Sequence, residues 1–126
     1  MGFSSTDQLK PAQRTAHLTE GPNGAPVLIA DTTSPGTVIH THDGENVLDR
    51  VWLYANNTDS VTRTLTIELA GTGGAANNIV VDVLPRDGLA LALPGVPISG
   101  GAAIRAYCPT ADVVSVVGYV EDLTRS

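Results

Sequence analysis

The chain has 126 residues, the size of one domain with a single core. Its formal net charge is −6 and Lys10 is its only lysine, so we expect neither nucleic acid nor an anionic membrane surface as a partner. No apolar stretch approaches the roughly 18 residues of a membrane span, and the first residues lack the pattern of a secretory signal.

The first 25 residues are polar and show no sustained hydrophobic period. Two interpretations stay open: a disordered tail, or an extended arm that becomes ordered on a neighbouring subunit, with a short strand at residues 14–19. In the second case Arg14 and His17 are candidate interface residues. The chain is therefore divided into an N-terminal arm or tail, residues 1–25, and a domain, residues 26–126.

From residue 26 onward, apolar or alternating runs recur at intervals of about 8–12 residues, as in sandwiches and barrels. The 13 glycines and 8 prolines supply the turns between them. Hydrophobic residues make up 42% of the chain and aromatic residues 4%, which predicts an aliphatic core. We expect an all-β fold: an antiparallel, jelly-roll-like β-sandwich of about eight strands. The predicted strands are residues 26–31, 37–42, 47–56, 61–69, 79–84, 89–93, 102–108 and 113–121.

The strongest β signal is formed by residues 47–56 and 61–69, which predict a long hairpin at the centre of the sandwich. The turn-rich segment between them is a candidate contact tip, with Asn57 and Asp59 as interface candidates. Apolar and polar residues alternate along the second strand, so its threonines and Glu68 are predicted to face solvent. The core candidates are Val51, Leu53, Leu65 and Ile67.

Two further segments lead to specific expectations. Residues 94–101 contain two prolines and are predicted to form a turn, because proline cannot donate a ladder hydrogen bond. Cys108 is the only cysteine, so it cannot form an intrachain disulfide, and we expect it to be a small buried hydrophobic residue.

The sequence His40-Thr41-His42 is the strongest candidate for chemistry. Residues two apart on a strand point to the same side, so both imidazoles could reach one metal ion, as in a cupin-like enzyme. A third ligand would have to come from His17, Asp43 or Glu45. A polar strand face or an interface hydrogen bond is the competing interpretation. No nucleophile–base pair and no phosphate loop can be assembled, so we expect no enzymatic activity and no cofactor.

Trp52 and Tyr54 are clustered aromatic residues on one side of a predicted strand. Their rings could stack on a sugar or on a base, although the absence of a basic groove disfavours a base. The other interpretation is a place in the core or in a subunit interface, and we expect an interface role for both.

The order of motifs over residues 36–121 resembles that of small β-sandwich virion proteins of tailed bacteriophages. The resemblance is carried by VIHT at 38–41, VWLYANN at 51–57, the threonine-rich residues 62–69, LPGVPISGG at 93–101 and VVGYVE at 116–121.

This resemblance implies a virion structural protein without catalytic residues: a capsid decoration, or cement, protein that is assembled in the host cytoplasm and binds across capsomers. The implied partners are other copies of the chain, with a trimer favoured, and the major capsid protein or another virion protein. Alternatives within the class are a head-spike or fibre-base protein and a head–tail or tail-associated protein. Outside the class stand the cupin-like enzyme built on His40 and His42 and a sugar-binding module built on Trp52 and Tyr54.

Overall fold

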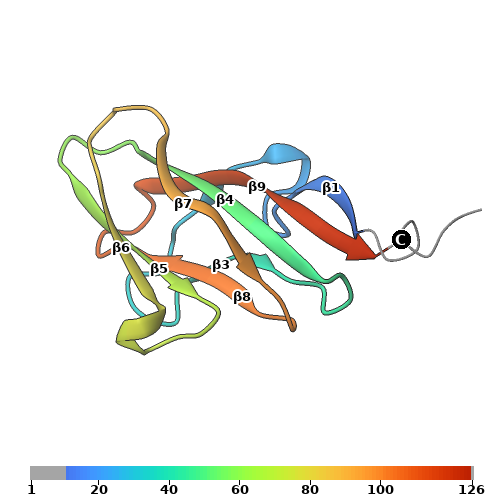
Figure 1. The fold of residues 1–126 in the computed structure, drawn as a ribbon. Coiled ribbons are helices and arrows are strands. Elements are labelled where there is room, and N and C mark those ends of the chain that lie inside the picture. The colour runs from blue at the N-terminus through green and yellow to red at the C-terminus, as the bar shows by residue number, and fades with distance from the viewer. Residues whose placement is uncertain (1–10, 126) are drawn as a thin grey trace, which may run out of the picture.

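A computed structural model describes residues 11–125, which fold into nine strands in two sheets packed face to face (Figure 1). Single 3-10 turns at Pro22–Gly24 and Ala75–Asn77 are the only helical segments within this range, and no helix there is long and apolar enough to cross a membrane. The strands are β1 (Pro11–His17), β2 (Val27–Leu28), β3 (Thr37–Thr41), β4 (Leu48–Asn57), β5 (Arg63–Leu69), β6 (Asn78–Val83), β7 (Ala90–Ile98), β8 (Ala103–Tyr107) and β9 (Val114–Arg125).

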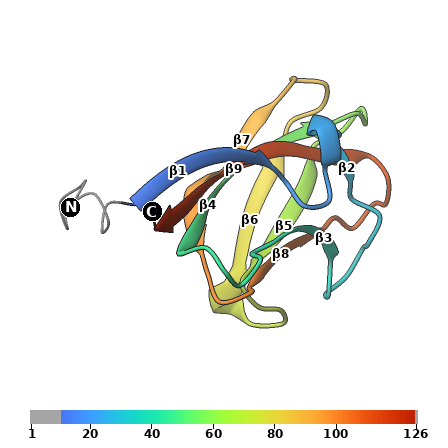
Figure 2. The ribbon, with the colours of Figure 1, turned by 90° about the vertical axis from the view of Figure 1, so that its right-hand side faces the viewer.

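The strands pair in a nested order around the β5–β6 hairpin. Strand β4 pairs with β7, β3 with β8, and both β1 and β2 with β9, always antiparallel. Alternate pairs lie in alternate sheets, which gives the strand orders β1-β9-β4-β7, here called the β4 sheet, and β3-β8-β5-β6, the β5 sheet (Figure 2). This is the arrangement of a jelly roll, so the predicted all-β sandwich is confirmed.

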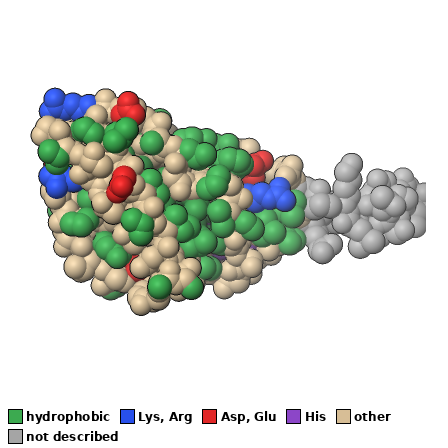
Figure 3. Space-filling model, turned by 60° about the vertical axis from the view of Figure 1, so that its left-hand side comes forward, with side chains coloured by type: hydrophobic (Ala, Val, Ile, Leu, Met, Phe, Trp, Pro, Cys, Tyr) green, Lys and Arg blue, Asp and Glu red, His purple; other side chains and the backbone are tan. Residues whose placement is uncertain are grey.

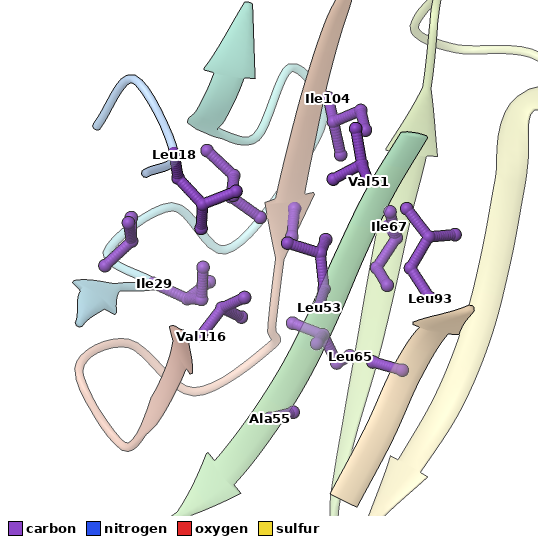
Figure 4. Close-up of a cluster of buried hydrophobic side chains, with 14 of the residues drawn as sticks. Leu18, Ile29, Val51, Leu53, Ala55, Leu65, Ile67, Leu93, Ile104 and Val116 are labelled. Carbon is purple, nitrogen blue, oxygen red and sulfur yellow. The ribbon is translucent and has the colours of Figure 1, made fainter. Parts of the chain in front are cut away.

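The core between the sheets is aliphatic. All four predicted core residues, Val51, Leu53, Leu65 and Ile67, are fully buried there (Figure 4). Strict alternation of buried and partly exposed residues along β4 is the period-two pattern of a strand with one face in the core. Cys108 is buried and free, as predicted.

The predicted central hairpin is wrong. Strand β4 pairs with β7 and β9, whereas β5 pairs with β6 and β8 in the opposite sheet. The segment between β4 and β5 therefore crosses from one sheet to the other. Alternation and turn residues mark where strands end, but they do not say in which sheet the next strand pairs.

Glu68 of β5 is also not where its pattern predicts. Its side chain is 1% exposed, because the segment before β3 folds over this part of the outer face. The carboxylate accepts hydrogen bonds from the Ser34 hydroxyl (2.5 Å) and the Gly36 backbone N–H (2.7 Å). The alternation correctly places Glu68 away from the core but cannot show what covers it.

The predicted turn at residues 94–101 is also wrong, since β7 continues to Ile98. Strand β7 lies at the edge of the β4 sheet and pairs on one side only, so Pro94 and Pro97 are tolerated without the ladder bonds of a central strand. The register with β4 shifts at two places along β7, which leaves Ala92 and Gly95 without a register partner.

Residues 11–17 are neither a tail nor an arm on another subunit. All seven form β1 and pair with β9 of the same chain. The sandwich therefore begins by residue 11, and the predicted strand at residues 14–19 is confirmed as far as His17. Residues 1–10 lie outside the described part of the chain.

Candidate functional site

A cluster of buried polar side chains lies at the end of the sandwich where β1 begins and β9 ends (Figure 1). Its core members are His40, His42, Asp49 and Asp122, each at most 5% exposed. Buried ionisable groups are costly unless they are paired, so the partners of each group decide what the cluster can do.

Asp49 and Asp122 are direct neighbours across β4 and β9, and Arg14 is the neighbour of Asp122 on β1. Burial raises the pKa of Asp122, and the hydrogen bond with Asp49 raises it further, against the opposing effect of Arg14 at 2.8 Å. Burial also acts to raise the pKa of Asp49, but its hydrogen bonds with Asp122, His40 and Asn46 outweigh burial and lower it. The two carboxyl groups therefore titrate as a coupled pair in which Asp49 loses its proton more readily than Asp122.

Each histidine has both ring nitrogens in hydrogen bonds. His40 Nδ1 accepts from the Thr19 backbone N–H (3.1 Å), and Nε2 donates to Asp49 (2.7 Å). His42 Nδ1 accepts from the backbone N–H groups of Gly44 and Gly101, and Nε2 lies 2.8 Å from the side-chain oxygen of Asn46. The backbone donors on Nδ1 select the tautomer in which Nε2 carries the proton.

The two histidines therefore have separate partners and do not converge on one point. His42 lies beyond the end of β3, and the register of β3 shifts before His40. The candidate third ligands do not complete a site either, because Asp43 accepts backbone hydrogen bonds from Glu45 and Asn46, and His17 is exposed on β1. Residues 11–125 contain no group of three or more His, Cys, Asp or Glu side chains that could hold a metal ion.

We expect zinc to leave the melting temperature of the protein unchanged, because a metal could reach His40 or His42 only by displacing existing hydrogen bonds. Differential scanning fluorimetry with and without a molar excess of Zn²⁺ measures this. A rise in Tm that disappears in His40→Ala, but persists in the control His17→Ala, would contradict the expectation.

Two surface cavities lie next to the cluster of buried polar side chains. The smaller, of about 150 Å³, is lined in part by His40, Asp49 and Asp122. The larger, of about 540 Å³, lies beside it and is lined in part by Arg14 and Asp43. A carboxyl and a carboxylate with diverging pKa values can serve as an acid–base pair. Here both side chains are already engaged with their neighbours, so the cluster ties β1, β3, β4 and β9 together.

The predicted contact tip after β4 is wrong for Asn57, which is fully buried. Its side-chain amide donates to the backbone oxygens of Val61 (2.8 Å) and Val83 (2.9 Å). Asp59 is partly buried and ion-paired with Arg63. Asn57 thus holds the β4–β5 connection against the end of β6 and is a structural residue.

The same contacts create an exposed apolar surface at this end of the molecule. The β4–β5 connection and the β6–β7 connection lie side by side, since the backbone N–H of Arg86 donates to the Asn57 oxygen (Figures 1 and 2). Four large aliphatic side chains on these two connections and at the start of β7 are each about half exposed, at 49–59%. These residues, called here the apolar end, are Val61, Leu84, Leu89 and Leu91. Figure 3 shows hydrophobic side chains over much of the side that carries β6 and β7.

Trp52 and Tyr54 lie on the outer face of the β4 sheet, opposite the core residues of β4. Placement in the core is therefore excluded for both. Trp52 is paired in register with Tyr119 of β9, and the two rings are nearly parallel, with an interplanar angle of 13° and centroids 6.1 Å apart. Arg14 is exposed and paired with Asp122, and exposed His17 lies beside Tyr119.

Sequence reasoning missed Asp49 and Asp122, the buried acidic partners of His40 and Arg14. Asp122 lies one residue beyond the predicted last strand, and Asp49 lies within a predicted strand without any sign of a partner. An acidic residue on the apolar side of an alternating strand was the available signal for both, since such a position needs a buried partner.

Comparison of the chain with protein-family models, curated proteins and solved structures finds no match.

Proposed function

We propose that this chain is a structural protein of a tailed-bacteriophage virion that acts as a capsid decoration protein. The observation that carries the proposal is the apolar end: Val61, Leu84, Leu89 and Leu91 form a surface that no described part of the chain covers. Exposed aliphatic groups of this kind mark contact sites for other proteins. The resemblance of residues 36–121 to phage virion sandwiches supports the assignment to a virion.

The polar groups that suggested an enzyme favour the same proposal. His40, His42, Asp49 and Asp122 are occupied in contacts that join four strands. Jelly rolls serve as capsid proteins, lectins and cupin enzymes, so the fold by itself does not choose among them. A decoration protein has to bind other proteins through an exposed surface, and the apolar end is such a surface. Many copies on one lattice then gain avidity.

We expect the protein to elute as an oligomer, with a trimer of three 13.0 kDa chains favoured. The subunits are expected to contact one another at the apolar end. Leu89→Ser should weaken assembly at least about tenfold, because it removes apolar area from the interface. Leu28→Ser is the matched control, since Leu28 is 50% exposed on β2, outside the apolar end. Size-exclusion chromatography with light scattering measures both, and equal assembly of the two variants would contradict this role for the apolar end.

Binding to the particle is tested with heads of the encoding phage that lack the protein. The chain should co-sediment with these heads, and Leu89→Ser should do so less than Leu28→Ser. A cryo-EM map of the complete virion then separates a decoration position on the head from a spike, fibre-base, head–tail or tail position. Absence of the chain from purified virions would overturn the proposal.

A further inference from the structure

A second surface, on the outer face of the β4 sheet, has the chemistry of a carbohydrate site. Its central members are Trp52 and Tyr119 in one row across β4 and β9, and Tyr54 in the next row. All three side chains are partly exposed. We propose that these residues, called here the aromatic platform, bind the pyranose rings of a polysaccharide.

The rings of the platform are held in place before any ligand arrives. The Trp52 indole N–H donates to Glu121 at 3.0 Å. The indole also lies over Gly95 of β7, where a Cβ would come within 2.6 Å of the ring. Gly95 thus provides space for the ring, and its φ of +67° suits glycine. Orientation by two neighbouring strands lowers the entropy cost of binding.

The geometry of the ring pair leaves surface available for a ligand. Two rings in face-to-face contact lie about 3.5–4.0 Å apart, whereas these nearly parallel rings have centroids 6.1 Å apart. The two rings are therefore not in close face-to-face contact. An exposed, flat aromatic surface is complementary to the C–H face of a pyranose ring.

Polar residues border the platform on both sides along the strands. One neighbouring row contains Thr15, Glu121 and Arg50 beside Pro97 of β7, and the opposite row contains Ser115 and Asn56 beside Leu28 of β2. Rows on the same face are about 6.6–6.8 Å apart, so these side chains stand where the hydroxyl groups of stacked sugars would project. Arg50 is the one cation among them, which disfavours the phosphate backbone of nucleic acid as the occupant.

The single tryptophan makes the proposal directly testable, because Trp52 fluorescence reports only on the platform. The probes are cellohexaose, chitohexaose and the delipidated polysaccharide of a bacterial lipopolysaccharide. At least one probe should change the Trp52 emission, with saturation at concentrations up to about 10 mM. The probe that binds then tells whether the ligand is a plain glucan, an N-acetylated chain or a bacterial surface polymer. No response to any of the three would overturn the proposal.

Substitutions then locate the site by isothermal titration calorimetry. Tyr119→Ala and Tyr54→Ser should each weaken binding about five- to tenfold, because each removes one stacking ring. The control Tyr107→Ala removes a partly exposed ring from the opposite sheet and should leave binding unchanged. Undiminished binding by the folded double variant Tyr54→Ser/Tyr119→Ala would also overturn the proposal.

The same fluorophore separates a glycan site from a protein interface. The apolar end reaches the platform only at Leu91, the register partner of Tyr54, so acrylamide should quench Trp52 in the assembled protein as in Leu89→Ser. Protection of Trp52 upon assembly would show that the platform is a subunit contact and would overturn the glycan proposal. The glycan proposal and the assembly proposal can thus be overturned separately.

Discussion

Asp49→Asn is expected to lower the free energy of unfolding by about 3 kcal/mol at pH 7, because it removes a buried carboxylate on which three hydrogen-bond donors converge. His40 donates to one oxygen at 2.7 Å and Asn46 to the other at 3.0 Å, and Asp122 forms a further hydrogen bond with Asp49. A neutral amide offers one acceptor oxygen in place of two charged ones, so at least one buried donor loses its partner. Urea unfolding followed by Trp52 fluorescence measures the loss.

The pH dependence of this loss has a definite sign. The folded-state pKa of Asp49 lies below its ordinary value of 3.8, so its contribution is present above 3.8 and disappears as the pH falls through the folded-state pKa. The difference between Asp49→Asn and the unaltered protein should therefore be largest at pH 5–7 and shrink at pH 3. A difference that grows on acidification would contradict the lowered pKa of Asp49.

Asp122→Asn is the matched control, and its effect should run the other way. The folded-state pKa of Asp122 lies above 3.8, so its contribution is complete below 3.8 and is lost as the pH rises through the folded-state pKa. An asparagine amide can donate to Asp49 as the protonated carboxyl does, and it does not titrate. Asp122→Asn should thus gain stability relative to the unaltered protein between pH 4 and pH 7, apart from the loss of the solvent-screened pair with the exposed Arg14.

Gly118→Ala is expected to cost more than about 3 kcal/mol, because the added methyl group collides with backbone and not with a movable side chain. A Cβ at this position would lie 1.9 Å from the Trp52 carbonyl oxygen and 3.2 Å from the Leu53 Cα. Gly118 faces Leu53 in the pairing of β9 with β4, the two central strands of their sheet. Relief of the collision requires these strands to separate and weakens their ladder.

A second glycine substitution serves as the control. Gly74 has an extended backbone, with φ of −111°, and its added Cβ would approach only the end of the Asn77 side chain, at 3.0 Å. Gly74→Ala should change the unfolding free energy by less than about 1 kcal/mol. Urea midpoints of the two variants, with circular dichroism to confirm the fold, test the comparison, and equal midpoints would show that β9 accommodates the extra methyl group.

Local patterns were sufficient for some parts of the molecule. Alternation in β4 and β5 predicted the sandwich and the buried positions of Val51 and Ile67, whereas Trp52 stayed open between the core and a subunit interface. These properties follow from the period-two geometry of a strand, which is present in any short stretch of sequence. The same geometry could not show that β7 lies at an edge, and so it could not predict a strand containing Pro94.

The candidate sites depended on contacts that no local pattern contains. Trp52 was identified, but its partners Tyr119 and Gly95 lie more than 40 residues away along the chain. The apolar end was missed because its members come from β7 and from the connections beside β5, β6 and β7, of which the segments at Val61 and Val83 are joined by the buried side chain of Asn57.

The sequence by itself determined an all-β, aliphatic sandwich, because the side chains of a strand alternate wherever its partners lie. Only the tertiary structure decided that β4 and β5 belong to opposite sheets, that β1 completes the β4 sheet, and that the pKa values of Asp49 and Asp122 shift in opposite directions. The reason is physical: strand pairing and pKa values depend on groups that are distant in sequence and adjacent in space.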